Sequence, residues 1–474
     1  MVYRSLRDFL KDLEDSGELV RFNEEVSLDL ELAAILRELA RRGGPVVIFE
    51  RIKEGTLPAV GNIFGTWGRV VRAVGSLTDA ASRMASLINV RPPSSLIDAI
   101  KSIGDLTRVA GYMPKRVSRA PVKEREWRDV DLGKIPALRQ WPLEPGRFIT
   151  FGATFIKHGG LVNFGYYRLQ VLGKDRFIVH WMPWRRSEYY SRLGSTEIAV
   201  VLGPDPVTML MAGVPIPHPL DKVFAAGVVR GEGVEVVEGS TVDLTYPANA
   251  ELVIEAKLTG EYADEGPFGD HVGYYSIVKK YPVAKVTAVY SREDPLIPVT
   301  TTAKPVMEDG NIIRFGVEVL KPLLTLIAPE VKDIYMPPEG VGYVTVVSIE
   351  KRYPGEARRV MNLLWGLLPV YNKVVVVVDS DVDVRDLGQV LYSVAANVNP
   401  QRDIVIVPES PTEELDPSTP IPNLGSKVGI DATRKLPEEY GGLPYPQEAR
   451  APGEVEGRAK AIVDEILGKV RKAT

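Results

Sequence analysis

The sequence predicts a mixed α/β (α+β) protein, in which a strand-rich middle lies between two regions where helices and strands alternate. Three observations support this. Apolar residues recur at helical spacing before about residue 110 and again after about residue 321. Short apolar runs separated by glycine turns fill the middle of the chain. The five valines Val374–Val378 are typical of a strand buried on both faces. A chain of 474 residues is long enough for about three domains.

The N-terminal region, residues 1–110, is predicted to be an α/β domain. Val46–Phe49 is a short apolar run that predicts a buried strand. Apolar residues spaced by three and four predict helices at 4–15, Leu28–Arg42, Asp79–Leu87 and Ser94–Ile103. Because helices surround the strand in the sequence, we expect them to pack against a sheet.

The middle region, residues 111–320, is predicted to be mainly β. It opens with a connection at 111–147 that is rich in proline and charge. Seven strands are expected, at Phe151–Ile156, Val162–Val171, Arg176–Trp181, Ile198–Leu202, Val234–Val237, Leu252–Leu258 and Val283–Tyr290. Two helices, Pro206–Met211 and Leu220–Val228, interrupt them. So many short strands favour an antiparallel barrel or sandwich.

The C-terminal region, residues 321–450, is predicted to be a second α/β domain. The expected strands are Val344–Ile349, Val374–Val378 and Ile404–Val407, and the expected helices are Glu356–Leu368 and Asp386–Val398. The tail, 451–474, has an amphipathic helical pattern at 453–471, and prolines separate it from the body. We expect this tail helix to dock on a neighbouring subunit.

Composition narrows the function. The net charge is −4 and no basic block is present, so we expect no nucleic-acid partner. The N-terminus lacks the apolar core of a signal peptide and no segment is apolar enough to span a membrane, which predicts a cytoplasmic protein without a membrane partner. With no cysteine and only four histidines, thiolate sites are excluded and an all-histidine metal site is not expected. The cysteine-free, valine-rich composition hints at a thermophilic source.

Glu261–Gly273, with the sequence E-Y-A-D-E-G-P-F-G-D-H-V-G, gathers acidic residues around a turn. Glycines and a proline predict a sharp reversal, which places Glu265 and Asp270 at its two ends. If both carboxylates face one point, one is pushed towards its protonated form and can serve as a general acid. A polar surface turn would explain the same residues, and for the turn alone it is the favoured interpretation.

Two further segments suit a charged ligand. In N-F-G-Y-Y-R, the period of two places Asn163 and Tyr167 on one face of a strand and Arg168 on the other. The oxygens of Asn163 and Glu235 suit a hard cation such as magnesium or manganese, although their separation in the sequence makes no metal motif. H-W-M-P-W-R-R, His180–Arg186, suits a planar phosphorylated ligand, and equally a surface loop with solvated arginines.

A rival site is D-S-D-V-D-V-R-D, Asp379–Asp386, which follows the valine strand. Carboxylates at a strand end can hold magnesium for phosphoryl chemistry, here through Asp379, Asp381 and Asp383. Aspartates also cap helices and form surface turns, and this interpretation is favoured.

In their order along the chain these segments resemble the UbiD family of reversible decarboxylases, which use prenylated FMN. The resemblance rests on L-R-D-F-L-K-D-L-E, N-F-G-Y-Y-R, A-G-V-V-R-G-E-G-V-E-V-V, E-G-P-F-G-D-H-V-G-Y-Y and S-K-V-G-I-D-A-T, and so covers most of the chain. It implies an N-terminal α/β domain, a split β-barrel core like that of flavin reductases, a C-terminal α/β domain, and a tail helix for oligomer contacts.

The resemblance also implies site residues. Arg168, Glu265 and Asp270 match the catalytic network, with Asp270 as proton donor. The implied cofactor contacts are Tyr166, Tyr167, Arg168, His180, Trp181, Met182, Arg185 and Arg186. Asn163 and Glu235 match ligands of a manganese ion that bridges the cofactor phosphate, and K⁺ can accompany it in the family. Trp184 stands where many relatives have a histidine, so the metal ligands here can differ.

The implied reaction is decarboxylation of an α,β-unsaturated or aromatic acid. The first expected substrate is trans-anhydromevalonate 5-phosphate, giving isopentenyl phosphate in the archaeal mevalonate pathway of isoprenoid biosynthesis. The alternative is a 4-hydroxybenzoate-type acid of quinone synthesis. A prenyl-flavin synthase would supply the cofactor, and a homodimer or larger homo-oligomer is expected. Two other classes stay open: a metal-dependent phosphatase using Asp379–Asp386, and a non-catalytic flavin-binding protein.

Overall fold

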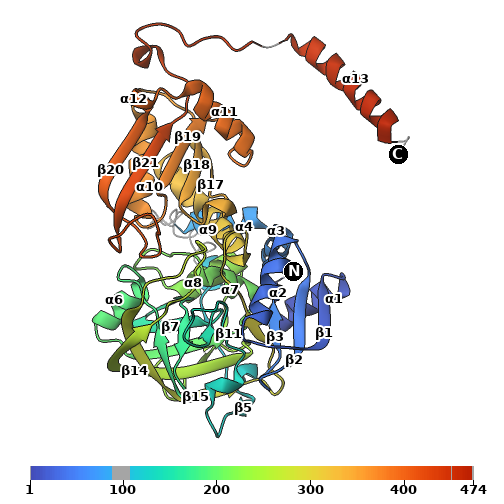
Figure 1. Ribbon diagram of the computed structural model, residues 1–474, viewed down its shortest axis with the longest axis vertical. Coiled ribbons are helices and arrows are strands. Elements are labelled where there is room, and N and C mark those ends of the chain that lie inside the picture. Colours follow the sequence, from blue (N-terminus) through green and yellow to red (C-terminus); the bar gives the residue numbers. More distant parts are fainter. Residues whose placement is uncertain (1, 88–106, 450, 472–474) are drawn as a thin grey trace.

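The computed structural model describes residues 2–87, 107–449 and 451–471. The helix expected at Ser94–Ile103 lies outside these residues. Figure 1 shows a lower body, an upper C-terminal unit and an extended tail. Short 3-10 turns occur at η1 (Pro121–Lys123), η2 (Leu132–Lys134), η3 (Pro338–Gly340) and η4 (Pro437–Glu439).

The N-terminal sheet has the order β1-β2-β3-β16, and its last strand comes from far along the chain. The strands are β1 (Leu19–Val26), β2 (Val46–Ile52), β3 (Ala59–Gly61) and β16 (Ile297–Val299), and the helices are α1 (Leu6–Asp15), α2 (Glu31–Arg41), α3 (Trp67–Val74) and α4 (Leu77–Ser86). The helices predicted at 4–15, Leu28–Arg42 and Asp79–Leu87 and the strand at Val46–Phe49 are confirmed. The prediction missed β1, because only Leu19 and Val26 at its ends are buried and its middle is polar.

A nine-stranded sheet forms the centre, and all its ladders are antiparallel. Its strands are β5 (Arg125–Glu126), β6 (Phe148–Ile149), β7 (Ala153–His158), β8 (Leu161–Tyr166), β9 (Leu169–Val171), β10 (Arg176–Val179), β11 (Glu197–Leu202), β14 (Leu252–Glu265) and β15 (Lys279–Ser291). The order is β6-β9-β10-β15-β14-β11-β7-β8, with β5 on β15. Within the described ranges no ladder joins β6 to β8, so the sheet is not a closed barrel.

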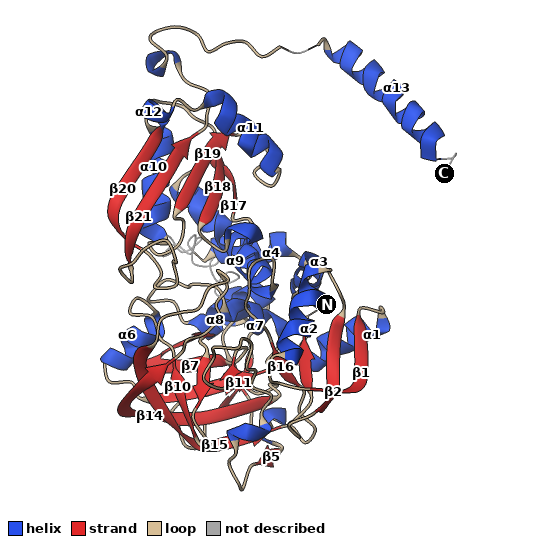
Figure 2. Ribbon diagram, viewed as in Figure 1, coloured by secondary structure: helices blue, strands red, loops and turns tan. Residues whose placement is uncertain are grey.

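Helices pack beside this sheet and against the N-terminal domain (Figure 2). They are α6 (Arg186–Arg192), α7 (Pro206–Ala212), α8 (Lys222–Arg230) and α9 (Glu308–Ile327). A small sheet, β13-β12-β4, is made of β4 (Lys115–Arg116), β12 (Glu235–Glu238) and β13 (Thr245–Pro247). The domain boundary expected at residue 320 falls within α9. This helix packs Phe315 into the core shared with the N-terminal domain and Leu324 into the C-terminal core.

The C-terminal sheet has the order β17-β18-β19-β21-β20. Its elements are β17 (Val331–Tyr335), β18 (Val344–Ile349), β19 (Val374–Asp379), β20 (Ile404–Pro411), β21 (Leu424–Asp431), α10 (Glu356–Leu367), α11 (Leu387–Asn397) and α12 (Pro400–Asp403). Val375 and Val377 join the core under α10, whereas Val376 and Val378 join the core on the opposite face. The expected burial of both faces of the valine strand is therefore confirmed.

The tail helix α13 (Gly453–Arg471) stands away from the body (Figure 1). Its apolar side chains are exposed, among them Val455, Ile462, Val463, Ile466 and Leu467. The oligomer contact expected for this helix stays a prediction. Among the described helices, none has the length and apolar character that crossing a membrane requires.

Candidate active site

Arg168 lies between β8 and β9 and is the centre of a buried ionic network. Its Nε and Nη2 donate to the two carboxylate oxygens of Glu265 at 2.7 and 3.0 Å. Its Nη1 donates to Asp270 Oδ2 at 2.5 Å, and Nη2 also reaches Ser276 Oγ at 3.1 Å. The ring of Phe268 lies 4.6 Å from the guanidinium carbon. One planar fork therefore holds both carboxylates in fixed positions.

The turn that carries these acids connects β14 to β15. Gly266 has φ +87°, a conformation that side chains other than glycine rarely adopt, and a Cβ on Gly269 would lie 2.0 Å from the Trp141 ring. Gln170 accepts a hydrogen bond from the Gly266 amide at 3.0 Å, and Ser276 Oγ accepts one from Phe268 at 3.1 Å. The predicted sharp reversal is confirmed, and it is packed into the body of the protein.

The charge state of the two acids differs from the sequence prediction. Burial alone would raise the pKa of Glu265, but the adjacent Arg168 guanidinium and His180 lower it to about 2. Burial would also raise the pKa of Asp270, yet His271 and Arg168 hold it well below its usual range. The expectation that one carboxylate is pushed towards its protonated form is therefore wrong for this arrangement, because a cation lies between the two anions.

His180 follows β10 and extends the network. Its Nδ1 lies 3.0 Å from Glu265 Oε2, and its ring lies 4.1 Å from that of Tyr281, centroid to centroid. Burial, reinforced by the charge of Arg168, lowers the pKa of His180, so the ring is neutral near pH 7. Its Nε2 is buried without a hydrogen-bond partner. His180 therefore supports Glu265 and has one ring nitrogen left for a ligand.

The sequence prediction missed three residues that complete the site. His271 is mostly buried, and its Nδ1 lies 2.6 Å from Asp270 Oδ1. Glu413 and Glu414 come from the loop that follows β20 in the C-terminal domain. Glu414 accepts from Lys279 at 2.8 Å and from the Tyr281 hydroxyl. The only signal for these glutamates was an acidic pair in a proline-rich loop.

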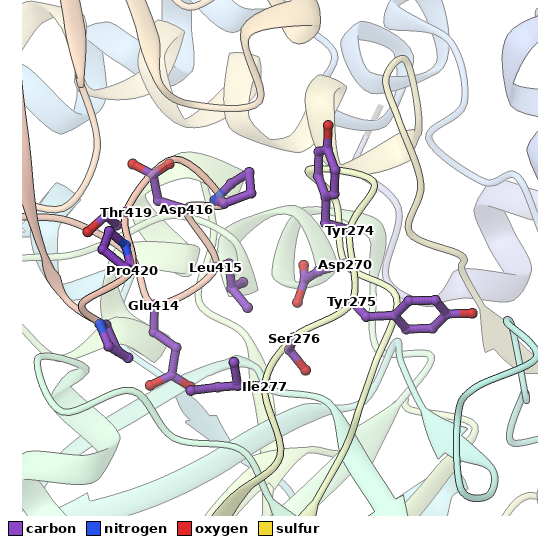
Figure 3. A pocket seen from close by; sticks show the side chains of 12 residues that line it. Asp270, Tyr274, Tyr275, Ser276, Ile277, Glu414, Leu415, Asp416, Thr419 and Pro420 are labelled. Atoms are coloured by element: carbon purple, nitrogen blue, oxygen red, sulfur yellow. The ribbon is translucent and has the colours of Figure 1, made fainter.

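A pocket of about 130 Å³ lies beside Asp270, between the acid turn and the C-terminal loop (Figure 3). Asp270 faces Leu415 across it. The lining residues are Asp270, Tyr274, Tyr275, Ser276, Ile277, Glu414, Leu415, Asp416, Pro417, Thr419, Pro420 and Pro422. This lining is apolar and acidic and includes no lysine or arginine. A small, largely apolar molecule could therefore reach the Asp270 carboxylate here.

Several predicted cofactor residues lie together around Ser187. Asn163 Nδ2 and the Tyr167 hydroxyl both donate to Ser187 Oγ at 2.9 Å, as the shared strand face predicted. The Trp181 ring lies 6.0 Å from that of Tyr167, in edge contact. Met182 is also buried. Tyr166 points elsewhere, because its hydroxyl donates to the Met209 carbonyl at 2.7 Å.

Three cations lie close to this cluster. Arg185 donates to the Tyr371 hydroxyl at 2.8 Å, and Arg186 donates to the Tyr190 hydroxyl and the Leu220 carbonyl. Lys222, which the prediction missed, donates to the Ala212 carbonyl at 3.3 Å. Burial, together with the charges of Arg185 and Arg186, lowers the pKa of Lys222 well below its usual value. Among the described residues, no carboxylate lies within ion-pair distance of the three.

Several buried polar atoms near the cluster around Ser187 have no hydrogen-bond partner. Arg186 Nη2, Trp181 Nε1 and Trp184 Nε1 are buried without a hydrogen-bond partner, as is the Nε2 of His180. Buried donors that lack partners are costly unless a ligand satisfies them. Uncompensated cations beside aromatic rings thus fit a planar, phosphorylated cofactor.

The predicted metal ligands share no contact. Asn163 bonds to Ser187, whereas Glu235 accepts from Asn249 Nδ2 at 2.8 Å. No group of three histidine, aspartate or glutamate side chains in the described part of the chain is arranged to hold a metal ion. The manganese site on Asn163 and Glu235 therefore stays a prediction.

The rival Asp379–Asp386 segment has a structural explanation. Asp379 Oδ2 accepts from Arg434 Nε at 3.0 Å, and Asp381 also pairs with Arg434. Asp386 caps α11 by accepting from the amides of Gly388 and Gln389. Ion pairing and capping account for these acids, so the phosphatase alternative gains no support.

Comparison with known proteins gives three matches in chain order. Residues 10–90, 115–305 and 311–432 match the N-terminal, Rift-related and C-terminal domains of the UbiD family, described as 3-octaprenyl-4-hydroxybenzoate carboxy-lyase. A protein of Archaeoglobus fulgidus that has no assigned function is 39% identical over 99% of this chain and 100% of its own length. A similar one from Aeropyrum pernix is 40% identical over 96% and 97%.

Two solved structures resemble the whole chain. The vanillic acid decarboxylase of Sedimentibacter hydroxybenzoicus in its open form has a TM-score of 0.81 and 27% identity, and covers 99% of this chain and 100% of its own. The UbiD-class enzyme HmfF of Pelotomaculum thermopropionicum, solved with FMN, has a TM-score of 0.77 and 29% identity, with coverage of 95% and 98%.

Proposed function

Since the chain belongs to the UbiD family of prenylated-FMN-dependent carboxy-lyases, we propose that its Arg168 site removes CO₂ from an acid whose α-carbon is part of a conjugated system. One observation carries this proposal: a single buried guanidinium holds both Glu265 and Asp270, near a cluster of cations that forms no ion pair with a carboxylate of the described residues. A purely flavin-binding protein has no need of this paired-acid arrangement.

The cation cluster would hold the cofactor. Arg185, Arg186 and Lys222 would bind its phosphate, and Tyr167 and Trp181 would pack against its ring system, with Met182 beside them. When bound, prenylated FMN supplies the electron sink that the departing CO₂ requires, which no side chain can provide. Asn163 and Glu235 are proposed to hold manganese at the phosphate, with K⁺ as a further candidate ion.

The protein's own groups position the substrate and move the proton. Arg168 orients the substrate carboxylate through the one N–H of Nη1 that Glu265, Asp270 and Ser276 leave available. Glu265 stays ionised and, with His180 behind it, keeps Arg168 in place. Asp270 lies at the pocket wall and delivers a proton to the α-carbon after CO₂ leaves.

Two substrates are proposed. A hydroxybenzoate-type acid suits the pocket beside Asp270 better than a phosphorylated acid does, because no lysine or arginine lines the pocket to bind a phosphate. The other proposed substrate is trans-anhydromevalonate 5-phosphate, with isopentenyl phosphate as product. This second acid carries a phosphate of its own, which would need a cation other than Arg185 and Arg186, because these two are assigned to the cofactor phosphate.

The proposal is tested by producing the protein together with a prenyl-flavin synthase. We expect a flavin absorption spectrum in the purified protein, CO₂ release from one of the two acids, and a homo-oligomer through α13. A protein that takes up the flavin but releases CO₂ from neither acid would contradict both substrate assignments. One that binds no flavin would contradict the proposed cofactor site.

A further inference from the structure

His271 holds Asp270 from the side opposite to Arg168. Asp270 Oδ2 accepts a hydrogen bond from Arg168 Nη1. Asp270 Oδ1 accepts hydrogen bonds from the backbone amide and from Nδ1 of His271, at 2.7 and 2.6 Å. Both carboxylate oxygens are thus engaged by donors. An aspartate held in this way is ionised, so before it can act as an acid it must receive a proton from a neighbour.

Only one of the two neighbours can give that proton. Arginine keeps its proton at any pH at which proteins fold. Histidine exchanges its proton readily, and the Nδ1 of His271 is at hydrogen-bond distance from the oxygen that would accept it. We propose that His271 protonates Asp270, which then passes a proton to the product carbon. This inference rests on the proposed decarboxylase function.

The substrate carboxylate leaves as CO₂, and its bonding electron pair remains on the α-carbon. His271 Nδ1 gives its proton to the ionised Asp270 at Oδ1, Asp270 passes a proton to the α-carbon, and solvent returns one proton to the imidazole. Substrate binding assists the transfer, because a second carboxylate competes for the charge of Arg168 and so raises the pKa of Asp270.

The groups around His271 come from three elements. Asp270 lies on the same turn, Asp309 lies at the start of α9, and Glu413 comes from the C-terminal loop with Oε2 3.7 Å from His271 Nε2. Burial lowers the pKa of His271, but the negative charges of Asp270, Glu413 and Asp309 outweigh it and raise the pKa to about 9. The imidazole therefore carries a proton across the neutral range.

The decisive variant is His271→Asn. An asparagine can still donate a hydrogen bond towards Asp270, but it has no proton to transfer. With flavin-loaded enzyme in D₂O, we expect deuterium incorporation at the product carbon to slow by about 100-fold, with unchanged flavin content. The melting temperature should fall, because the variant lacks the charge that pairs with the buried Asp270 in the wild type. His218→Asn, which changes an exposed histidine, serves as the matched control and should behave as the wild type.

The pH profile distinguishes proton supply from a structural role. Wild-type turnover should fall above about pH 9, as His271 loses its proton. This alkaline limb should be absent in His271→Asn, and Glu413→Gln should move it to lower pH. A ¹⁵N-histidine NMR titration of the unloaded protein measures the same pKa without any turnover.

Two results would overturn the inference while leaving the proposed function intact. One is an unchanged rate and profile in His271→Asn, and the other is a His271 pKa at or below its ordinary value of 6.5. A wild-type enzyme that loads flavin, shows the raised His271 pKa and decarboxylates no acid would instead overturn the proposed function, and this inference with it.

Discussion

Two acidic segments of this chain look alike in sequence and differ completely in structure. Glu265 and Asp270 lie on a buried turn and share one guanidinium, and the Glu265 side chain is 0% exposed. Asp379 and Asp381 also share one arginine, Arg434, but Asp381 is 51% exposed. The number of carboxylates and the type of their partner are the same. What differs is burial, which makes the first network costly to break and leaves the second screened by water.

The largest effect is expected from Arg168→Met. Removing this side chain leaves the buried Glu265 without a counter-charge and Asp270 with His271 alone, which costs about 3–5 kcal/mol of the free energy of unfolding. Turnover should be lost as well. Chemical denaturation of the flavin-free protein measures the first effect. Arg168→Lys retains the charge but not the planar guanidinium, so it should recover part of the stability. If Arg168→Met were as stable as the wild type, burial would not distinguish the two acidic segments in stability.

Glu265→Gln should act mainly on catalysis. The amide keeps the size of the side chain but cannot hold Arg168 by charge, so the guanidinium shifts from its position and turnover falls by about 100-fold. Steady-state kinetics of flavin-loaded enzyme check this. An unaltered kcat would show that Glu265 is not needed to place Arg168.

The contribution of the buried network to the free energy of unfolding should decrease at both acid and alkaline pH. Glu265 has its pKa lowered from 4.5 to about 2 in the folded protein, so its contribution is present above pH 4.5 and is lost as the pH falls towards 2. His271 has its pKa raised from 6.5 to about 9, so its contribution is present below pH 6.5 and is lost as the pH rises through 9. Unfolding free energies measured across this range should form a plateau, and in Arg168→Met the acid limb should flatten.

The smallest effect is expected from Asp381→Asn. This exposed pair contributes less than about 1 kcal/mol, because water and salt screen it. Decarboxylation should be unchanged. A loss of activity in this variant, or magnesium-dependent phosphatase activity in the wild type, would mean that the second segment is a functional site.

The sequence predicted elements best where burial is one-sided or complete. The helix at 4–15 was found because its apolar residues follow the helical period, and the valine strand was found because an uninterrupted apolar run is typical of a strand buried on both faces. Strand β1 was missed because its middle residues are polar. Helix α9 was missed because Pro322 and Gly316 interrupt a pattern that tertiary packing nevertheless keeps helical.

The site was predictable only in part, because its residues come together from distant positions. The period of two placed Asn163 and Tyr167 on one face, and the glycines of the acid turn indicated its reversal. No local pattern could show that Glu413 reaches His271 from another domain. The ionised state of Asp270 also depends on Arg168 and His271 at specific atoms, which composition does not reveal.

The central claim is that Asp270 is the proton donor of a decarboxylase, and Asp270→Asn tests it most directly. The variant should be produced with prenyl-flavin synthase, its flavin content confirmed from the absorption spectrum, and CO₂ release measured on the acid that the wild type uses. The account predicts bound flavin with turnover reduced at least about 100-fold. Full turnover by the flavin-loaded variant would contradict it.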